Sequence, residues 1–288
     1  MPELPEVETM ARELAPLVVG ATITSAWTDW PAAVRYPDPS GYATSLAGRT
    51  ILDVRRRAKW LVLGLDRGAL VIQVKMTGQL SVVAAELRRD PHVHATWTFA
   101  DGREMRLRDV RKFARIGAYD PETLAVTLAQ HGPEPLEPDF TLAAFRRLLR
   151  GRRARLKPLL LDQAFLAGVG NIYADEALWR ARLHPLRHAH TLRRADERRL
   201  YRAIRSILTE AIERRGSSVN DYTAPEGDGE MQEHLDVDQR TGLPCHRCGR
   251  PIRRIVIGAR GTHFCSWCQR LAASERDASA RRLLRPTT

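Results

Sequence analysis

The four cysteines of this chain lie in one short stretch near its C-terminal end. Cys245 and Cys248 form one CxxC pair, Cys265 and Cys268 form a second, and sixteen residues separate the two pairs. Two such pairs at this spacing predict a tetrahedral site in which four thiolates bind one structural Zn²⁺. Two disulfides or free thiols are the alternatives, and disulfides are disfavoured because they are rare in proteins that stay inside the cell.

The segment between the two pairs, PIRRIVIGARGTHF, predicts a β-hairpin with its tip at residues 258–261. Zinc would hold the base of this hairpin and leave Arg260 projecting from a rigid tip. A single arginine at a turn is usually only solvated. In a chain with a formal net charge of +12, contact with a nucleic-acid phosphate or minor groove is the better interpretation.

The charge of the whole chain points to polyanions, with nucleic acid first and an acidic membrane surface second. Of its 46 basic residues only Lys59, Lys75, Lys112 and Lys157 are lysines. A genomic bias toward arginine codons is the main explanation, and it makes each lysine a weak candidate for a position where a compact, titratable ammonium matters. No apolar run is long enough to span a membrane, and the first residues lack the layout of a secretory signal. We therefore expect a bacterial, cytoplasmic protein that associates with the nucleoid through DNA.

Hydrophobic periodicity divides the chain into a strand-rich part and a helical part. Residues 1–15 predict a helix that begins near Pro5. Short, partly alternating segments then predict an antiparallel sandwich or barrel, at residues 21–27, 50–56, 60–65, 69–76, 95–100 and 104–110. After the proline-rich segment 131–139, apolar spacing predicts helices at residues 141–151, 156–162, 171–183 and 195–215.

This pattern indicates an α+β fold in four parts. We expect a helix with a β-sandwich domain at residues 1–130, a helical domain at 131–240, a zinc-finger hairpin at 241–270 and a frayed tail at 271–288. Residues 216–243 are polar and rich in glycine, aspartate and serine, which predicts a mobile loop. The sequence gives no reason to expect an oligomer.

The opening MPELPE suggests an unusual nucleophile. Met1 precedes a small residue, so its removal would expose the secondary amine of Pro2. An α-amine has a pKa of about 7.7–8.0, which leaves about a tenth or more as the free base at neutral pH. Such an amine could attack a sugar C1′ to form an iminium, and Glu3 could move the accompanying proton. On composition alone, a simple helix lead-in is the better explanation of PELPE.

The segment AGVGNIYADEALW predicts a helix that starts at a phosphate site. Asn171 is a good N-cap, and the preceding glycines allow a DNA backbone to approach exposed N–H groups closely. By itself this signal is weak, because glycine-rich helix starts are more often plain turns.

Five motifs together carry a family resemblance. MPELPEVE, RRAKWL, DVRKFA, GVGNIYADEALW and the four-cysteine hairpin occur in this order. Over residues 1 to about 270 they resemble the formamidopyrimidine-DNA glycosylases, bifunctional enzymes that excise oxidised purines such as 8-oxoguanine and then cleave the abasic site. The resemblance implies a helix-two-turn-helix module in the helical domain, with residues 216–240 covering the lesion.

The resemblance also implies roles for individual residues. Pro2 would be the Schiff-base nucleophile and Glu3 the proton donor beside it. Lys59 would act at the phosphate and in β-elimination, and Arg260 in backbone contact and δ-elimination. The DNA-contacting positions would be His92, Arg111, Arg152, Lys157 and Asn171, and the residues that enter the duplex as the damaged nucleotide leaves would be Met76, Arg111 and Phe113. Without the family, Met76 and Phe113 would read as ordinary core residues.

Departures from the family pattern leave alternatives open. Asp238 and Gln239 stand where tyrosine and glycine are common, Met231 where an aromatic is usual, and Ala114 where glycine is common. The first three are expected near the lesion-covering loop, so they bear on lesion preference. An endonuclease VIII-like enzyme for oxidised pyrimidines is one alternative, against which Leu4 and YADEALW argue. A non-catalytic DNA-binding protein is the other, and it would leave Pro2 idle.

Overall fold

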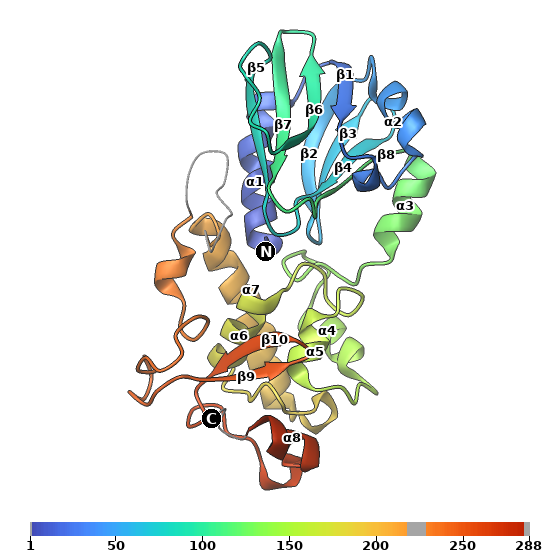
Figure 1. Cartoon of the computed structure of the whole chain (residues 1–288). Coiled ribbons are helices and arrows are strands. Elements are labelled where there is room, and N and C mark those ends of the chain that lie inside the picture. Colours follow the sequence, from blue (N-terminus) through green and yellow to red (C-terminus); the bar gives the residue numbers. More distant parts are fainter. Residues whose placement is uncertain (1, 218–228, 285–288) are drawn as a thin grey trace. The chain divides into compact units, whose positions relative to one another are not determined.

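The computed structural model describes residues 2–217 and 229–284 (Figure 1). The chain divides into two units, which are described separately. The first contains residues 1–130 together with 212–232, and the second contains residues 131–211 together with 233–288.

Two antiparallel sheets build the first unit (Figure 1). One has the strand order β1 (Ile23–Thr28), β6 (Val93–Phe99), β7 (Arg103–Asp109), β5 (Gly78–Ala84). The other has the order β2 (Ile51–Arg57), β3 (Trp60–Leu65), β4 (Ala69–Gln73), β8 (Arg115–Tyr119). The expected sandwich is therefore present, and two of its strands, β5 and β8, were not foreseen. β5 was missed because only two of its seven residues are fully buried, which weakens its apolar signal.

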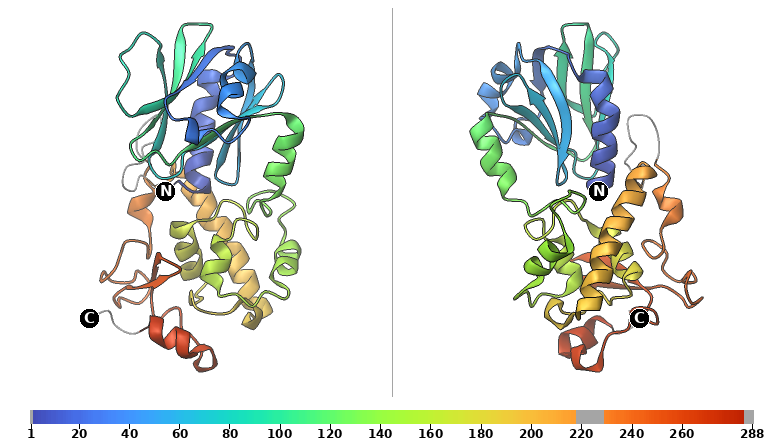
Figure 2. Two further views of the ribbon diagram at one scale, coloured as in Figure 1. Left: turned by 45° about the vertical axis from the view of Figure 1, so that its right-hand side comes forward. Right: turned by 180° about the vertical axis from the view of Figure 1, so that it is seen from behind.

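The core of this sandwich is continuous with the apolar face of helix α1 (Leu4–Val18). Leu4, Val7, Met10, Leu14 and Val18 recur at helical spacing and are buried. The helix packs against β2 and β3, as Figure 2 shows from two sides. The fully buried Trp97 satisfies its indole N–H by donating to the Tyr42 hydroxyl at 2.9 Å.

Two short helices in this unit are stabilised by aspartate N-caps. α2 (Pro39–Leu46) has glycine, serine and threonine in its sequence and was not predicted. It forms because Asp38 accepts from the N–H groups of Ser40 and Gly41, with Pro39 at the first helical position. α3 (Pro121–Ala129) begins in the same way behind Asp120, which accepts from Thr123.

The second unit is built from four helices around an aromatic cluster. Phe140, Phe145, Phe165 and Tyr201 lie with ring centroids 5.6 to 6.4 Å apart. The helices are α4 (Leu142–Leu149), α5 (Leu156–Leu161), α6 (Asn171–Arg180) and α7 (Arg194–Glu213). All four were predicted from apolar spacing. Helix α6 packs against α5 and against strand β10 of the C-terminal hairpin.

That hairpin consists of β9 (Arg253–Ile257) and β10 (Arg260–Phe264). Its turn is Gly258 and Ala259, with φ of +55° and +61°, as a two-residue turn with matching twist requires. The tip is therefore tighter than the four residues expected. Arg260 follows the turn directly and is exposed.

The expectation of a frayed tail was wrong for residues 271–284. Helix α8 (Ala278–Leu283) begins behind Asp277, whose carboxylate also pairs with Arg155 at 2.9 Å. Leu271 and Ala280 are buried against Phe264, Ile255 and Ile257. The hairpin is too thin to cover its own apolar face, and this segment supplies the cover. No helix among the described residues is long and apolar enough to cross a membrane.

A buried histidine makes the stability of the second unit depend on pH. His184 packs edge-on against Phe264 at 4.7 Å, and its Nδ1 accepts from the Leu186 N–H. Burial, reinforced by Arg276, Arg253 and Arg155, lowers the pKa of His184 to about 3. Because the folded-state pKa lies below the unfolded one, this contribution is complete above about pH 6.5 and is lost as the pH falls towards 3.

We therefore expect the free energy of unfolding to fall by up to about 1.4 kcal/mol per pH unit through this window on account of His184. The measurement is denaturant unfolding between pH 6.5 and 4.5, compared with His184→Asn. Asparagine keeps an acceptor near the Nδ1 position and cannot titrate, so the variant should have the shallower slope. Parallel slopes would show that His184 is not responsible.

Candidate active site and zinc centre

The first residues are held firmly at the start of α1. Pro2 and Glu3 are both buried, and Glu3 is the N-cap of the helix in a capping box with Glu6. The Glu3 N–H donates to Glu6 Oε2 at 2.8 Å. The nitrogen of Pro2 thus lies one residue before a fixed helix end.

The Glu6 side chain also fixes a distant part of the chain. Its Oε1 accepts from the Ser217 N–H at 2.9 Å. Gly216 has a φ of +75°, and a Cβ there would lie 2.8 Å from the same oxygen, so only glycine fits. Arg215 forms an ion pair at 2.6 Å with Glu13, which lies on α1 like Glu6.

These contacts explain why residues 212–232 belong with the first unit and not with the helical domain expected from sequence. Most of the expected lesion-covering loop, residues 218–228, lies outside the described residues. Its described end closes on its start, because the Met231 N–H donates to the Gly216 carbonyl at 3.0 Å. Met231 is fully buried, so it is a core residue here.

The structure brings together Met76, Arg111 and Phe113. Arg111 Nη1 lies 3.6 Å from the Met76 sulfur, and its Cζ lies 4.6 Å from the Phe113 ring centroid. Met76 and Phe113 are 36% and 40% exposed, so neither is the core residue that sequence reasoning alone favoured. A partly exposed apolar pair beside a guanidinium is suited to replace a base in a duplex.

The residue that assembles this trio is Asp109, which sequence reasoning missed as a site residue. Its fully buried carboxylate accepts from the N–H groups of Phe113 and Ala114 at 2.8 and 2.7 Å, and from the Thr77 hydroxyl. Asp109 thereby connects the loop that contains Met76 and Thr77 with the loop that contains Arg111 and Phe113. The available signal was an aspartate at the end of a strand before a charged turn, which is common and weakly informative.

Lys59 lies in the turn between β2 and β3, which Ala58 enters with a φ of +54°. Lys75, next to Met76, also has a positive φ, of +56°. The pKa of Lys75 is lowered by partial burial and by the nearby charges of Arg115, Lys59 and Arg35. Such crowding of cations is suited to binding an anion. Lys75 was noted from the sequence only as one of four lysines, and Arg115 and Arg35 were not noted at all.

The other DNA-contacting candidates are dispersed. His92 is half-buried, with its N–H donating to Asp90 at 2.7 Å and its ring 6.5 Å from that of His94. Arg152 is exposed in the connection between α4 and α5, 5.9 Å from the Phe165 ring. Asn171 is the first residue of α6, and Gly170 is its N-cap, which corrects the expectation that Asn171 caps the helix. The buried Asn171 Oδ1 has no hydrogen-bond partner among the described residues.

Lys157 is placed differently from a phosphate-contacting lysine. Its side chain is fully buried, and its Nζ donates to the Asn171 carbonyl and lies 2.7 Å from Asp175 Oδ1. A buried ammonium cannot reach DNA without a rearrangement. Lys157 instead stabilises the start of α6 through its contacts with Asn171 and Asp175.

We expect Lys157→Met to destabilise the protein by about 3 kcal/mol, because it removes the cation 2.7 Å from the buried Asp175 and leaves, among the described residues, only the His263 ring, at 3.7 Å. Denaturant unfolding would measure this loss, and the double variant Lys157→Met/Asp175→Asn should recover part of it. Lys112→Met, at an exposed lysine, is the control and should change stability by less than about 0.5 kcal/mol. A folded, stable Lys157→Met protein with weakened DNA binding would favour a direct contact instead.

Asp175 continues into a second buried pair. Its Oδ2 accepts from the backbone N–H of His263 at 2.8 Å. The ring Nδ1 of His263 lies 3.0 Å from Asp238 Oδ1. Burial alone would lower the pKa of His263, but the bonds to Asp175 and Asp238 outweigh it and raise the pKa to about 9. Asp238 therefore lies in the second unit, against β10, and not with the loop near which it was expected. Gln239 has a φ of +57°, which accounts for glycine being common there.

The four cysteines converge as a metal site requires. Their Sγ atoms lie within 4.8 Å of one another, and Cys245 and Cys265 are buried. The Trp179 indole N–H donates to Cys245 Sγ at 3.4 Å. The Arg250 backbone N–H lowers the pKa of the Cys248 thiol to about 7, which favours the thiolate that zinc binds. The donor set fits one tetrahedral Zn²⁺.

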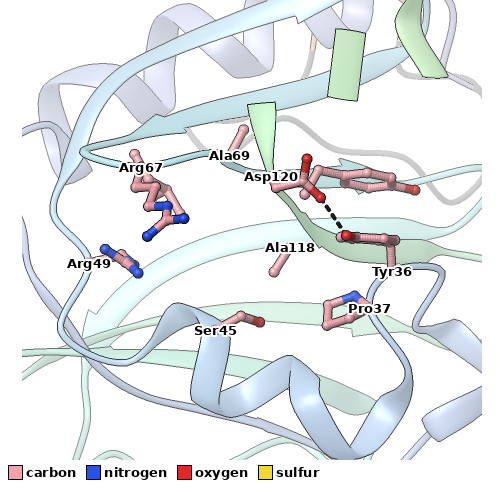
Figure 3. A pocket seen from close by; sticks show the side chains of 10 residues that line it. Tyr36, Pro37, Ser45, Arg49, Arg67, Ala69, Ala118 and Asp120 are labelled. Atoms are coloured by element: carbon pink, nitrogen blue, oxygen red, sulfur yellow. Dashed lines mark hydrogen bonds between the residues drawn. The ribbon is translucent and has the colours of Figure 1, made fainter. Parts of the chain in front are cut away.

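A hollow on the first unit contains none of these residues. Tyr36, Arg49, Arg67 and Asp120 line it, with Ala69 and Ala118 between them (Figure 3). The Tyr36 hydroxyl donates to Asp120, and the Tyr36 ring stacks on that of Tyr119 at 5.1 Å. The Asp120 carboxylate already caps α3 and accepts from Tyr36. The polar groups of the hollow therefore have structural roles, and we assign no ligand to it.

Three family models match successive parts of the chain. They are the formamidopyrimidine-DNA glycosylase N-terminal domain at residues 1–116, the H2TH domain of the same enzymes at 131–223, and a zinc finger found in FPG and IleRS at 242–271. The chain belongs to the formamidopyrimidine-DNA glycosylase family. Its finger holds one structural zinc on Cys245, Cys248, Cys265 and Cys268.

Named relatives of this glycosylase-family chain cover nearly all of it. The formamidopyrimidine-DNA glycosylase of Chloroflexus aurantiacus is 48% identical over 93% of this chain and 98% of its own. That of Geobacillus kaustophilus is 43% identical over 94% and 100%. The resemblance inferred from five motifs is thus confirmed.

Solved structures agree with the fold. The MutM (FPG) protein of Thermus thermophilus has a TM-score of 0.84 and 44% identity, covering 93% of this chain and 98% of that one. The Lactococcus lactis Fpg in complex with DNA containing an abasic site has a TM-score of 0.88 and 37% identity, covering 93% and 100%.

Proposed function

We propose that this protein excises oxidised purines, 8-oxoguanine and formamidopyrimidines, from duplex DNA and then cleaves the abasic site by β,δ-elimination. The observation that carries the proposal is the buried, capped start of α1, which holds the Pro2 nitrogen beside Glu3. A relative of the same fold, a point mutant of the Lactococcus lactis Fpg, is described in complex with a Fapy-dG containing DNA. DNA containing oxidised bases or abasic sites is the proposed partner.

The chemistry begins once Met1 is removed. The Pro2 nitrogen attacks C1′ of the damaged nucleotide, the bond from C1′ to the base breaks, and the base leaves with a proton. Glu3 protonates the sugar ring oxygen as the ring opens. The resulting iminium makes the C2′ proton acidic, so its loss expels the 3′ phosphate, and a further elimination expels the 5′ phosphate.

The remaining site residues provide access and positioning in this proposal. The nucleotide must leave the stack, at a cost of a few kcal/mol, and Met76, Arg111 and Phe113 offset it by filling the vacated space. Lys59, His92, Arg152 and Asn171 bind phosphates, with Lys59 also assisting β-elimination. Arg260 binds the backbone from the finger and assists δ-elimination. Lys157 is assigned a positioning role because it is buried.

Borohydride trapping on three duplexes tests the proposal. They contain 8-oxoguanine opposite cytosine, thymine glycol, or no damage. A covalent adduct chiefly on the first supports the purine activity. An adduct chiefly on thymine glycol would favour an endonuclease VIII-like enzyme. No adduct on any duplex, from protein whose first residue is verified as Pro2, would leave a DNA-binding protein without this chemistry. Size-exclusion chromatography should show a monomer.

A further inference from the structure

Four arginines surround one exposed tryptophan at the zinc end of the hairpin. Arg250 and Arg270 lie 3.8 and 3.9 Å from the Trp267 ring centroid. Both guanidinium groups stack on Trp267, which keeps 48% of its surface accessible. Arg182 and Arg247 line the adjoining hollow, together with Trp267, Arg270 and two zinc ligands. We call Arg182, Arg247, Arg250, Arg270 and Trp267 the knuckle patch.

The arginines of the knuckle patch have no carboxylate partner among the described residues. Some other arginines of this unit do have one, and some, such as Arg198 and Arg202, do not. Arg180 pairs with Glu210, Arg187 with Asp196 and Arg146 with Glu197, all within 3 Å. Across residues 2–217 and 229–284, no carboxylate lies within ion-pair distance of Arg182, Arg247, Arg250 or Arg270. Arg247 instead stacks on Trp179 at 3.8 Å and donates to its carbonyl.

The zinc site does not account for all of this charge. Four thiolates around one Zn²⁺ carry a net charge of about −2. Four arginines therefore leave an excess of about two positive charges at the surface. Stacking on Trp267 restricts the two guanidinium groups of Arg250 and Arg270, which reduces the entropy lost when they bind an anion.

We propose that the knuckle patch binds phosphates of duplex DNA on the flank of the segment held by Arg260. This inference rests on the proposed function. β10 spans the five residues from Arg260 to Phe264, a length of about 16 Å, and Cys265 follows it directly. The tip and the knuckle patch are thus two ends of one stiff element, separated by about half a turn of B-DNA. A duplex lying along the hairpin meets both.

An acidic protein segment is the competing occupant. Three observations favour phosphates: the stacked guanidinium groups of Arg250 and Arg270, a hollow in which Arg182, Arg247 and Arg270 lie beside Trp267, and the position on the zinc finger. If the knuckle patch binds the flank of the DNA, its contribution to affinity should depend on the length of the duplex. A short duplex that ends near the lesion cannot reach the knuckle patch, and a long one can.

The experiment measures the affinity of two uncleavable abasic-analogue duplexes. The long one has about 30 base pairs. The short one has about 12 and ends about three base pairs from the lesion on the side that the finger contacts, which is less than the half-turn between Arg260 and the knuckle patch. For Arg250→Gln/Arg270→Gln we expect about tenfold weaker binding of the long duplex, with a salt slope reduced by about 2, and binding of the short duplex within about twofold of the parent. Arg198→Gln/Arg202→Gln removes two exposed charges from α7 as the matched control and should have a smaller effect. Zinc content verifies the finger, and Trp267→Leu provides a second test that keeps both charges and should lose part of the length dependence.

Equal losses on both lengths, no loss on either, or a loss matched by the α7 control would overturn the inference. So would a loss of polyglutamate binding without a loss of long-duplex binding, which would point to an acidic protein. Failure of the parent protein to bind or cleave the short lesion duplex would contradict the proposed function itself, so the two failures are distinguishable.

Discussion

Protein that keeps Met1, or whose Pro2 amine is acetylated, should form no borohydride-trapped adduct and should lose base excision by about 10⁴-fold or more. The physical reason is that an amide or acylated nitrogen has no lone pair available to attack C1′. DNA affinity should change by less than about threefold, because phosphate contacts and the Met76, Arg111 and Phe113 trio supply most of it. Single-turnover cleavage and equilibrium binding would be measured on the same preparation.

Pro2→Gly is the informative control for this prediction. Glycine still supplies a primary amine after removal of Met1, so retained activity would be consistent with the mechanism. An enzyme of full activity with a verified blocked terminus would contradict it. In that case a lysine such as Lys59 would have to supply the nitrogen.

The second large effect concerns the finger. Cys265→Ser should remove the zinc and weaken binding of a lesion duplex by about 100-fold or more, since structural zinc contributes about 10–16 kcal/mol to the folding of small zinc modules. Cys265 also touches more than the metal. Its backbone N–H donates to Gln269, whose side-chain N–H donates to the Leu183 carbonyl, so loss of the ion also loosens the finger from the helices of the second unit.

Metal analysis, circular dichroism and DNA binding would check this result. Ser266→Ala, at the neighbouring exposed residue, should retain one zinc and normal affinity. The first unit should remain folded in both variants because its core contains no residue of the finger. A Cys265→Ser protein with one equivalent of zinc would show that the four thiolates are not the ligand set.

The parts of the molecule that could be predicted from sequence are those specified by local patterns. The segment WLVLGL is the strand Trp60–Leu65 at the same bounds, because a fully apolar run bounded by turns has few alternatives. The cysteine spacing identified the zinc site for a similar reason. The proposed roles of Pro2 and Glu3 could be formulated from MPELPE, but only the family resemblance favoured them over an ordinary helix start.

The parts that could not be predicted depend on long-range contacts. Nothing near Lys157 in sequence says that its ammonium will be buried beside Asp175, and nothing near Asp109 says that it will join two loops. Residues 212–232 were expected with the neighbouring helices, but Glu6 and Glu13 lie more than 200 positions away and hold Ser217 and Arg215. From sequence alone, charged residues of this kind are predicted to lie on the surface, because their buried partners are distant in the chain.

The cover that α8 and Leu271 place over the hairpin has a consequence for how such a finger can be transplanted. A finger excised at Arg270, just after its last cysteine, would carry its metal but expose Phe264, Ile255 and Ile257. It would be an adhesive fragment, prone to self-association at the face that the C-terminal segment now occupies. The transferable unit is therefore longer than its zinc motif, and a host protein that accepts the finger must also accept the fourteen residues that follow, 271–284, or provide an apolar surface in their place.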